Sequence, residues 1–382
     1  MKASIVTTTI HQPVLLADYC RNLKRYGHEA VEFIVVGDKK TPVDVGAYCR
    51  QLQEEHGYVV EYYDVDRQEE YLKPFAELAA HLPYDSIQRR NVGLLLAFER
   101  GADVIVTIDD DNFVSEEDFL GHHAVVGSVV ERTAVHSSTG WFNVCRLLIE
   151  RQRLPFYHRG YPMGQRWAES EEGSRRVTTA RVVVNAGLWL EDPDIDAVTR
   201  MALPIHAIAV EAEGRPGIVL DDGTWCPFNS QNTALAREVI PAYFLSPHIG
   251  RYDDVWASFF LRVICDHLGG AVGYGSPVVR QVRNAHDLWR DLDAERLGMH
   301  MTDRLVNVLR TVTFREDTYA GCYRELIEAL KDMAHQRAPF TSQERTIVLQ
   351  VLEGMEIWSK TFERWTSVGA HCRQSNVERG RS

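Results

Sequence analysis

The sequence predicts an α/β fold, with a mixed, mostly parallel sheet flanked by helices and a C-terminal helical extension. Over the first 110 residues, short apolar runs alternate with helical patterns, which is typical of βαβ units. The last of these runs leads directly into three adjacent aspartates. From about residue 293 onward the periodicity is helical. We therefore expect one large domain over residues 1–292 and a helical region over residues 293–382.

The first 110 residues contain four predicted strands and four predicted helices. Each strand is an apolar run rich in β-branched residues, and each helix is a longer segment with helical period. The strands are expected at Ala3–Thr8, Val31–Val36, Tyr58–Tyr63 and Val104–Ile108. The helices are expected at Val14–Tyr26, Val43–Glu55, Glu69–His81 and Ser86–Arg100.

Polar side chains follow these strands at one edge of the predicted sheet. In a parallel sheet, ligands bind beyond the carboxyl ends of the strands. Thr8 and Asp38 stand in the loops after the first two strands and are candidates for binding a nucleotide. Arg89 and Asn91, on the helix before the fourth strand, could face the same ligand. The alternative is that this helix face is only solvated.

The aspartates after Val104–Ile108 are the strongest local signal. Asp109, Asp110 and Asp111 repel one another, so this strand end is costly unless a cation neutralises it. Carboxylate oxygens suit Mg²⁺ or Mn²⁺. Along an extended segment, Asp109 and Asp111 point to one side, toward a metal and its diphosphate, and Asp110 points to the other. The alternative is a solvated turn that caps the next helix.

Residues 151–176 are polar, rich in arginine and broken by proline and glycine, which predicts a long loop and a candidate lid. A local arginine cluster on an acidic protein suits a diphosphate leaving group. The alternative is a solvated surface loop. The candidate arginines are Arg151, Arg153, Arg159 and Arg166.

Two further candidates lie beyond this loop. Asp253 and Asp254 open the helix predicted at Tyr252–Gly269, where they could act as a general base or hold a sugar hydroxyl. They could also only stabilise the positive end of that helix. Later strand-like runs stand at Arg181–Val184, at Ile218–Leu220 and near Pro277–Val282. His286 follows the last of these and could be a further metal ligand, or an ordinary surface histidine.

The C-terminal region is predicted to form three helices, at Arg304–Val312, Tyr319–His335 and Ser342–Trp365. The last helix carries an apolar face that could bury against the domain or against a second copy of the chain. A homo-oligomer formed through these helices is therefore one expectation. The face consists of Val348, Val351, Leu352, Met355 and Trp358.

Composition excludes several classes of protein. The net charge of −12, from 42 basic and 54 acidic residues, argues against a general nucleic-acid-binding protein. No stretch approaches the roughly 20 apolar residues that span a bilayer, and the first residues are too polar for a signal peptide. The seven cysteines are scattered without a CxxC pair, so we expect a cytoplasmic protein. We find no GxGxxG, GxxxxGK[ST] or GxSxG motif, so we expect no flavin or nicotinamide.

The order of the motifs resembles a known family. A strand, an Asp-x-Asp, a long loop and an acidic helix start are the layout of a GT-A glycosyltransferase fold. Six segments, in this order, resemble the plant reversibly glycosylated polypeptides, which act as UDP-arabinopyranose mutases. They are IDDDNF (108–113), RGYP (159–162), GLWLEDPDIDA (187–197), CPFNSQNTALAREVIPAYF (226–244), GRYDDVWASFFLRVICDHLG (250–269) and GYGSPVV (273–279).

The resemblance implies a flavin-free, divalent-metal-dependent interconversion of the pyranose and furanose forms of a nucleotide sugar, linked to UDP or GDP. It implies that Asp109, Asp110 and Asp111 bind the metal and the diphosphate and that Arg159 is essential. The family also carries an arginine that becomes glycosylated, for which Arg151 and Arg153 are candidates here. Some bacterial relatives resemble GDP-sugar mutases of antibiotic pathways, including a GDP-L-galactose mutase.

One departure from the family pattern concerns the third metal ligand. The family usually has a histidine where this chain has Gln281, and His286 is the candidate to replace it. Two other functions stay open at this point. One is a retaining or self-glycosylating glycosyltransferase that uses the same residues, and the other is a non-enzymatic subunit of a larger assembly.

Overall fold

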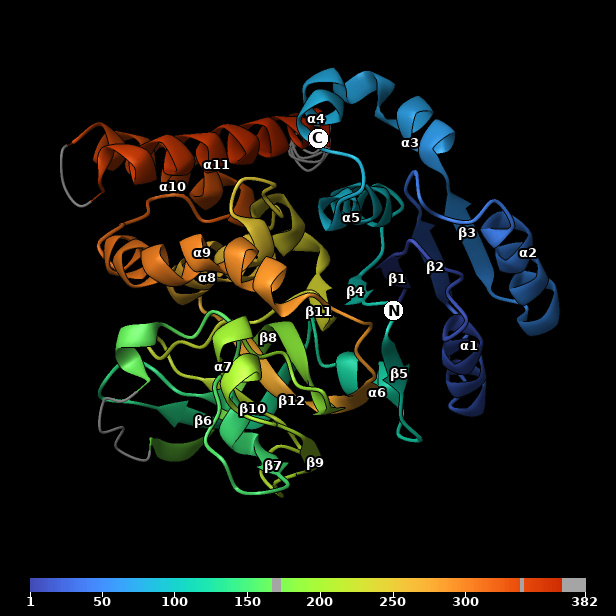
Figure 1. Ribbon diagram of the computed structural model, residues 1–382, viewed down its shortest axis with the longest axis horizontal. Coiled ribbons are helices and arrows are strands. Elements are labelled where there is room, and N and C mark those ends of the chain that lie inside the picture. Colours follow the sequence, from blue (N-terminus) through green and yellow to red (C-terminus); the bar gives the residue numbers. More distant parts are fainter. Residues whose placement is uncertain (167–172, 337–339, 366–382) are drawn as a thin grey trace, which may run out of the picture.

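Four parallel strands form one half of the sheet in the computed structural model, which describes residues 1–166, 173–336 and 340–365 (Figure 1). Their order is β3-β2-β1-β4, as βαβ units with short crossovers require. The strands are β1 (Ala3–Thr8), β2 (Val31–Val36), β3 (Val59–Tyr63) and β4 (Val104–Ile108). The connecting helices are α1 (Leu16–Arg25), α2 (Val45–His56), α3 (Val65–Leu72), α4 (Ala76–His81) and α5 (Arg90–Glu99).

Helix packing explains why β1, β2 and β4 are apolar along most of their length. Helices cover both faces of a parallel sheet, so its strands are buried on both sides. The helix α5 lies close against β1 because residue 93 is glycine. A Cβ atom at Gly93 would stand 2.4 Å from Cγ1 of Val6.

One predicted helix is divided in the structure. The sequence pattern predicts a single helix at Glu69–His81, but α3 ends at Leu72 and α4 begins at Ala76. A 3-10 turn at Lys73–Phe75 separates them and contains Pro74. Proline lacks a backbone N–H and its ring clashes with the preceding helical turn, so the continuous helix is broken.

The other half of the sheet is mixed and is built around one long strand, β8 (Ser174–Glu191). Its first part pairs with β6 (Val129–His136) and its second part runs parallel to β12 (Gly270–Gln281). The strand β10 (Ile218–Leu220) pairs with both β6 and β12 and closes these four strands into a ring. The remaining elements are β5 (Asn112–Val114), β7 (Leu148–Glu150), β9 (Ala207–Val210), β11 (Asn232–Ala236), α6 (Phe119–His123) and α7 (Ala197–Ala202).

Four longer helices cover the mixed half of the sheet, and Figure 1 shows α10 and α11 as an adjacent pair beyond α8 and α9. They are α8 (Asp253–Leu268), α9 (Leu288–Leu309), α10 (Tyr319–His335) and α11 (Ser342–Thr361). The predicted GT-A-like α/β class with a C-terminal helical extension is confirmed. The domain boundary expected after residue 292 stays a proposal.

The apolar face predicted on the last helix packs within the chain. Val348, Val351, Leu352, Met355 and Trp358 are all buried in the single chain. The indole Nε1 of Trp358 donates a hydrogen bond of 3.0 Å to the carbonyl of Ile240. Of the two expected roles for this face, packing against the domain is the one observed, so it is not available to a second copy. The described helices include none that is long and apolar enough to cross a membrane.

Candidate active site

The aspartate turn after β4 is held in place by β11. The backbone N–H of Asp109 donates to the carbonyl of Gln231 at 3.1 Å, and the Asn112 side chain donates to the same carbonyl at 2.9 Å. Asp109 and Asp111 line one cavity, whereas Asp110 lines another. This division is the one that the alternation of side chains along an extended segment predicts.

The cavity beside Asp109 and Asp111, here called the aspartate cavity, measures about 80 Å³. It brings together residues from the ends of β4, β8, β11 and β12 and from the segments before α8 and α9. Acidic, basic and amide side chains make up its whole lining. They are Asp109, Asp111, Asp194, Arg200, Gln231, Arg251, Gln281, Arg283 and His286.

The two carboxylates of this cavity have different partners. Asp109 forms an ion pair with Arg90. The Arg90 side chain is buried and also donates a hydrogen bond of 2.7 Å to the Ser230 carbonyl. Asp111 has no such cation. Burial, together with repulsion from Asp109 and Asp110, raises the pKa of Asp111 to about 7. The sequence predicts that Arg90, like its neighbours Arg89 and Asn91, could face the nucleotide, but in the structure Arg90 pairs with Asp109.

Three buried oxygen atoms around Asp111 have no hydrogen-bond partner among the described residues. They are Oδ1 of Asp111, Oε1 of Gln231 and Oε1 of Gln281. All three residues line the aspartate cavity, where the pairing of β5 with β12 sets Gln281 opposite Asn112. A buried oxygen without a partner is costly. Carboxylate and amide oxygens are ligands of hard divalent cations, so these residues fit Mn²⁺ or Mg²⁺.

His286, predicted as a further metal ligand, does line the aspartate cavity. Its Nδ1 lies 3.2 Å from Oδ1 of Asp291, which fixes the ring. A carboxylate on one ring nitrogen is the usual support for a histidine that binds a metal through the other. Within the described part of the chain, no three His, Cys, Asp or Glu side chains stand close enough to hold a metal by themselves. Two glutamines supply the additional oxygens.

Three arginines that the sequence did not single out surround this cavity. Arg200 comes from α7, Arg251 from the 3-10 turn before α8, and Arg283 from the segment after β12. Burial, with repulsion from Arg200 and Arg251, lowers the pKa of Arg283 to about 10. Each of the three has a carboxylate partner in the chain. A guanidinium carries five N–H donors, so the cluster can also bind a diphosphate.

A second cavity, here called the β1 cavity, lies at the ends of β1 and β2 and measures about 230 Å³. Four predicted nucleotide-binding residues line it together: Thr8, Asp38, Arg89 and Asp110. The Asp110 side chain accepts a hydrogen bond of 2.6 Å from Thr9, and Asp38 accepts one of 3.0 Å from the backbone of Ser86. Figure 1 shows this end of β1 and β2 close to the start of α5.

Asn91, predicted with this group, lies elsewhere. Its side chain is fully buried and exchanges two hydrogen bonds with the backbone of Leu245, at 2.9 and 3.1 Å. A third bond goes to the carbonyl of Gln88. These contacts use the Asn91 side chain to join α5 to the segment before α8. The expectation that Asn91 faces the nucleotide is therefore wrong.

Arg159 does not belong to an open lid. Its guanidinium is buried and pairs with Asp194 at 2.9 Å and with Asp254 at 3.2 Å. Although burial acts to raise it, the pKa of Asp194 lies well below its usual range because Arg159 stands beside it. Arg159 therefore orients Asp194, which lines the aspartate cavity, and cannot swing out to a ligand without breaking two ion pairs.

Asp253 and Asp254 are buried behind the aspartate cavity and are not part of its lining. Asp254 accepts hydrogen bonds from the backbone and hydroxyl of Ser230 at 3.0 and 3.2 Å. Asp253 accepts one from Gln88 at 2.8 Å. Burial and repulsion from Asp254 raise the pKa of Asp253 to about 7. Asp254 pairs with Arg159 and is linked to Arg90 through Ser230. The direct contact of Asp253 and Asp254 with a sugar stays a prediction.

The other arginines of the predicted lid lie away from both cavities. Arg151 and Arg153 are exposed, and Arg153 pairs with Glu211 at 3.5 Å. Arg166 is buried and pairs with Asp196 at 2.7 Å. Part of the predicted lid, residues 167–172, lies outside the described residues. The arginines that line the aspartate cavity are Arg200, Arg251 and Arg283, and none of them comes from the 151–166 cluster.

Sequence comparison gives one family. A family model described as "Reversibly glycosylated polypeptide" matches residues 4–368. The "UDP-arabinopyranose mutase 3" of Arabidopsis thaliana is 27% identical over 271 residues, covering 69% of this chain and 68% of that protein. The "UDP-arabinopyranose mutase 1" of Oryza sativa subsp. japonica is 28% identical and covers 68% and 67% of the two chains.

Two similar solved structures each hold a nucleotide sugar and Mn²⁺. The mannosyltransferase PcManGT from Pyrobaculum calidifontis, in complex with GDP-Man and Mn²⁺, aligns over 96% of this chain and 87% of that chain. Its identity is 10% and the TM-score is 0.43. The glucosyl-3-phosphoglycerate synthase from Mycobacterium tuberculosis, with Mn²⁺ and UDP-glucose, covers 81% and 77% of the two chains at 11% identity, with a TM-score of 0.35.

Proposed function

The chain belongs to the reversibly glycosylated polypeptide family, and from this premise we propose that it is a metal-dependent, flavin-free mutase of nucleotide sugars. It interconverts the pyranose and furanose forms of a sugar linked to UDP or GDP. The reaction cleaves and re-forms the bond between the anomeric carbon and the diphosphate. The names of the relatives, which are UDP-arabinopyranose mutases, support this class of reaction.

The observation that carries the proposal is the composition of the aspartate cavity. Carboxylates, amide oxygens and three arginines meet there at the carboxyl end of β4. A divalent cation would satisfy the buried oxygens that have no partner among the described residues. The arginines keep N–H donors beside their carboxylate partners, and these would bind a diphosphate. We assign the nucleoside to the β1 cavity, which is lined by Thr8, Asp38 and Arg89.

Asp111, Asp109, Gln231 and Gln281 would hold the metal, with His286 as a further ligand. A bound Mn²⁺ or Mg²⁺ supplies Lewis acidity, which stabilises negative charge on the departing diphosphate. Arg200, Arg251 and Arg283 bind the same diphosphate and keep it beside the sugar. The metal ion that the aspartate triplet predicts stays a proposal. The carboxylate and amide oxygens that line the aspartate cavity support it.

The sugar rearranges while the diphosphate stays bound. The bond from C1 to the diphosphate breaks and its electron pair passes to the phosphate oxygen. O4 bonds to C1 through a lone pair, the C1–O5 bond then breaks with its electron pair on O5, and the proton that O4 loses is taken up at O5. The diphosphate oxygen then bonds to C1 again. Asp194, held by Arg159, accepts the hydrogen bond of the moving hydroxyl and orients it.

The test needs no acceptor. The chain is incubated with Mn²⁺ and a nucleotide sugar alone, in parallel for UDP- and GDP-linked pentoses and hexoses, and the sugar ring form is followed by NMR. A furanose that appears without nucleotide release supports the mutase. Nucleotide release only when an acceptor is added would overturn it in favour of a glycosyltransferase.

A retaining or self-glycosylating glycosyltransferase is the second candidate. Arg151 and Arg153 are exposed and could carry a transferred sugar. Mass spectrometry of the chain after incubation with a radiolabelled nucleotide sugar locates such a modification. A stable sugar on either arginine, with no furanose in solution, would favour this candidate.

A further inference from the structure

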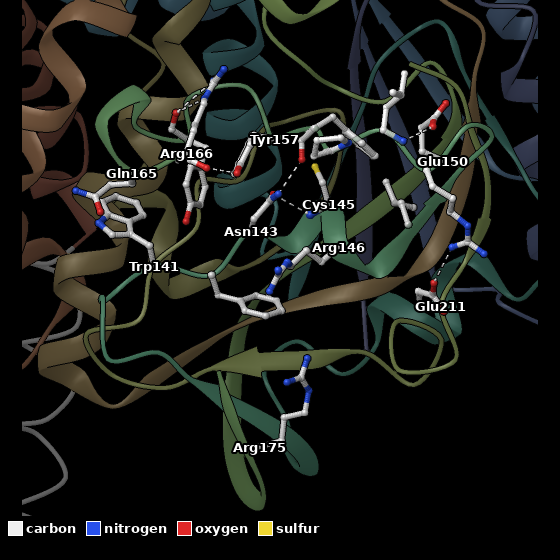
Figure 2. Close-up of a pocket in the computed structure, with 17 residues that line it drawn as sticks. Trp141, Asn143, Cys145, Arg146, Glu150, Tyr157, Gln165, Arg166, Arg175 and Glu211 are labelled. Atoms are coloured by element: carbon white, nitrogen blue, oxygen red, sulfur yellow. Dashed lines mark hydrogen bonds and ion pairs between the residues drawn. The ribbon is translucent and has the colours of Figure 1, made fainter. Parts of the chain in front are cut away.

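A further cavity lies apart from the two that make up the proposed reaction site. It measures about 520 Å³, which is within the usual range for a small-molecule pocket. Residues 141–161, which include β7, form most of its lining, and Arg175 reaches in from β8 (Figure 2). It shares no lining residue with the aspartate cavity or the β1 cavity. We call it the aromatic pocket.

Aromatic rings form much of one wall. Trp141 and Tyr161 pack edge to face with ring centroids 5.6 Å apart, and Tyr157 and Tyr161 lie 5.2 Å apart. Phe142 and Phe156 complete the set, and both line the pocket. Aromatic walls of this kind pack against the apolar faces of sugar rings or other flat ligands.

The charges of the pocket are almost all neutralised within the chain. Arg153 pairs with Glu211, Arg166 with Asp196, and Arg175 with Glu213. Glu150 accepts hydrogen bonds from the backbone of Gln152 and Leu154, at 2.7 and 2.9 Å. These groups hold the walls and leave little charge for a ligand.

Arg146 is the exception. Nothing in the described ranges 1–166, 173–336 and 340–365 makes an ion pair or a hydrogen bond with its guanidinium. Arg146 nevertheless lines the pocket, and Figure 2 shows it beside Asn143. Gln165, also in the lining, has a side-chain amide that is likewise without a partner in the described chain. A planar guanidinium beside aromatic rings recognises a phosphate or carboxylate on a ring-shaped ligand.

We propose that the aromatic pocket is a second ligand site that binds a phosphorylated sugar. The phosphate pairs with Arg146, the sugar ring packs on the aromatic wall, and hydroxyls bond to Gln165 and Asn143. The site is outside the proposed reaction centre, so it holds either an acceptor-like compound or an effector, and not the nucleotide sugar that is rearranged. The proposal does not depend on the mutase activity.

The test is isothermal titration of the full chain with glucose 6-phosphate, inorganic phosphate and glucose. Saturable binding of glucose 6-phosphate that is stronger than binding of either fragment is expected. Arg146→Gln should weaken it by about tenfold or more, because a charge-assisted bond is lost. Arg324→Gln is the matched control, since Arg324 is also exposed, lies on α10 and is outside the pocket.

A third variant separates this site from the reaction centre. Arg283→Gln changes the aspartate cavity but not the aromatic pocket. Binding of glucose 6-phosphate that survives Arg283→Gln and is lost in Arg146→Gln supports the proposal. The reverse pattern would assign the sugar phosphate to the aspartate cavity, and absent binding or equal binding in Arg146→Gln would also overturn the second site. None of these outcomes depends on turnover.

Discussion

Three consecutive aspartates have three different environments in this chain. Asp109 is neutralised by buried Arg90, and Asp110 accepts a hydrogen bond from Thr9 in the β1 cavity. Asp111 has one oxygen buried without a partner in the described residues, and its pKa is raised to about 7 by burial and by its neighbours. The three identical side chains therefore differ in role: Asp109 forms an ion pair, Asp110 accepts a hydrogen bond, and Asp111 keeps an oxygen that can bind a metal.

This difference predicts which aspartate binds the metal. Asp111→Asn removes the unpaired carboxylate, so the affinity for Mn²⁺ should fall by at least about tenfold. Electron paramagnetic resonance of free Mn²⁺ measures the loss, and circular dichroism checks that the fold survives. Asp110→Asn is the matched control, because Asp110 lies in the other cavity. Unchanged Mn²⁺ binding in Asp111→Asn would refute the assignment.

Arg159 is predicted to matter for stability as well as for activity. Arg159→Ala leaves Asp194 and Asp254 buried without their shared cation. Breaking a buried ion pair in this way typically costs about 3–5 kcal/mol. Urea denaturation should show a loss of this size, whereas Arg153→Ala, which removes an exposed pair, should lower the free energy of unfolding by less than about 1 kcal/mol. Equal effects of the two changes would contradict the buried network.

The raised pKa of Asp253 gives a pH dependence with a definite sign. The folded chain holds this proton up to about pH 7, because burial and Asp254 disfavour the charge. The unfolded chain releases it near pH 4. Between these values the native state binds more protons, so the contribution of Asp253 to stability falls as the pH rises, by up to a few kcal/mol.

Asp253→Asn should remove this contribution. The free energy of unfolding, measured by urea titration at pH 5 and pH 8, is expected to fall less between the two values in the variant than in the wild type. The remaining slope reports the other titrating groups. A variant whose pH dependence equals that of the wild type would show that Asp253 is ionised throughout this range.

At the residue scale, site residues that are neighbours in the sequence could be predicted, and site residues that are far apart in the sequence could not. The aspartate triplet follows an apolar strand, so its place at the sheet edge follows from local pattern alone. The three arginines of the aspartate cavity are far apart in the sequence: Arg200, Arg251 and Arg283. Only the fold, in which β8 pairs with β12, brings them together. The arginines at 151–166 were favoured because they are neighbours in sequence, but folding directs them to buried and surface ion pairs.

At the element scale, fully buried strands were the most predictable. β1, β2, β4 and β10 begin and end where their apolar runs do. The strand β8 was predicted only at Arg181–Val184. Its first half is mostly polar and exposed, and it is held in the sheet by pairing with β6. The helix α9 begins at Leu288, before the expected boundary, since Asp287 caps it with bonds to Trp289 and Arg290.

The packing of α11 gives the prediction at this scale. Trp358 is fully buried and bonds to the Ile240 carbonyl, so it ties the last helix to the domain. Trp358→Ala should cost about 3–5 kcal/mol, as large-to-small changes in cores do. Thermal unfolding measures the loss, and Trp289→Ala, at an exposed site on α9, is the control with little expected effect. Light scattering of both variants should match the wild type, because this face is buried within the chain.

At the scale of the whole molecule, the C-terminal helices and the site are one structure. Glu295 of α9 accepts hydrogen bonds from Arg251 at 3.0 Å and from the backbone of Ala197 at 2.7 Å. Asp291, also in α9, pairs with Arg283 at 2.7 Å. Two of the three arginines of the aspartate cavity therefore depend on a helix that crosses the proposed boundary after residue 292.

A chain that ends after residue 287 is accordingly predicted not to behave as an independent catalytic domain. It lacks α9, so Arg251 and Arg283 lose their carboxylates and the indole of Trp256 loses its 3.1 Å hydrogen bond to Thr302. We expect no cooperative thermal transition and no measurable binding of UDP in the presence of Mn²⁺, by calorimetry. A chain that ends after residue 365 keeps every contact named above and should bind and melt like the full chain. If the shorter chain retained wild-type melting and UDP affinity, the aspartate cavity would be complete without α9. The helical region would then contribute neither to thermal stability nor to binding.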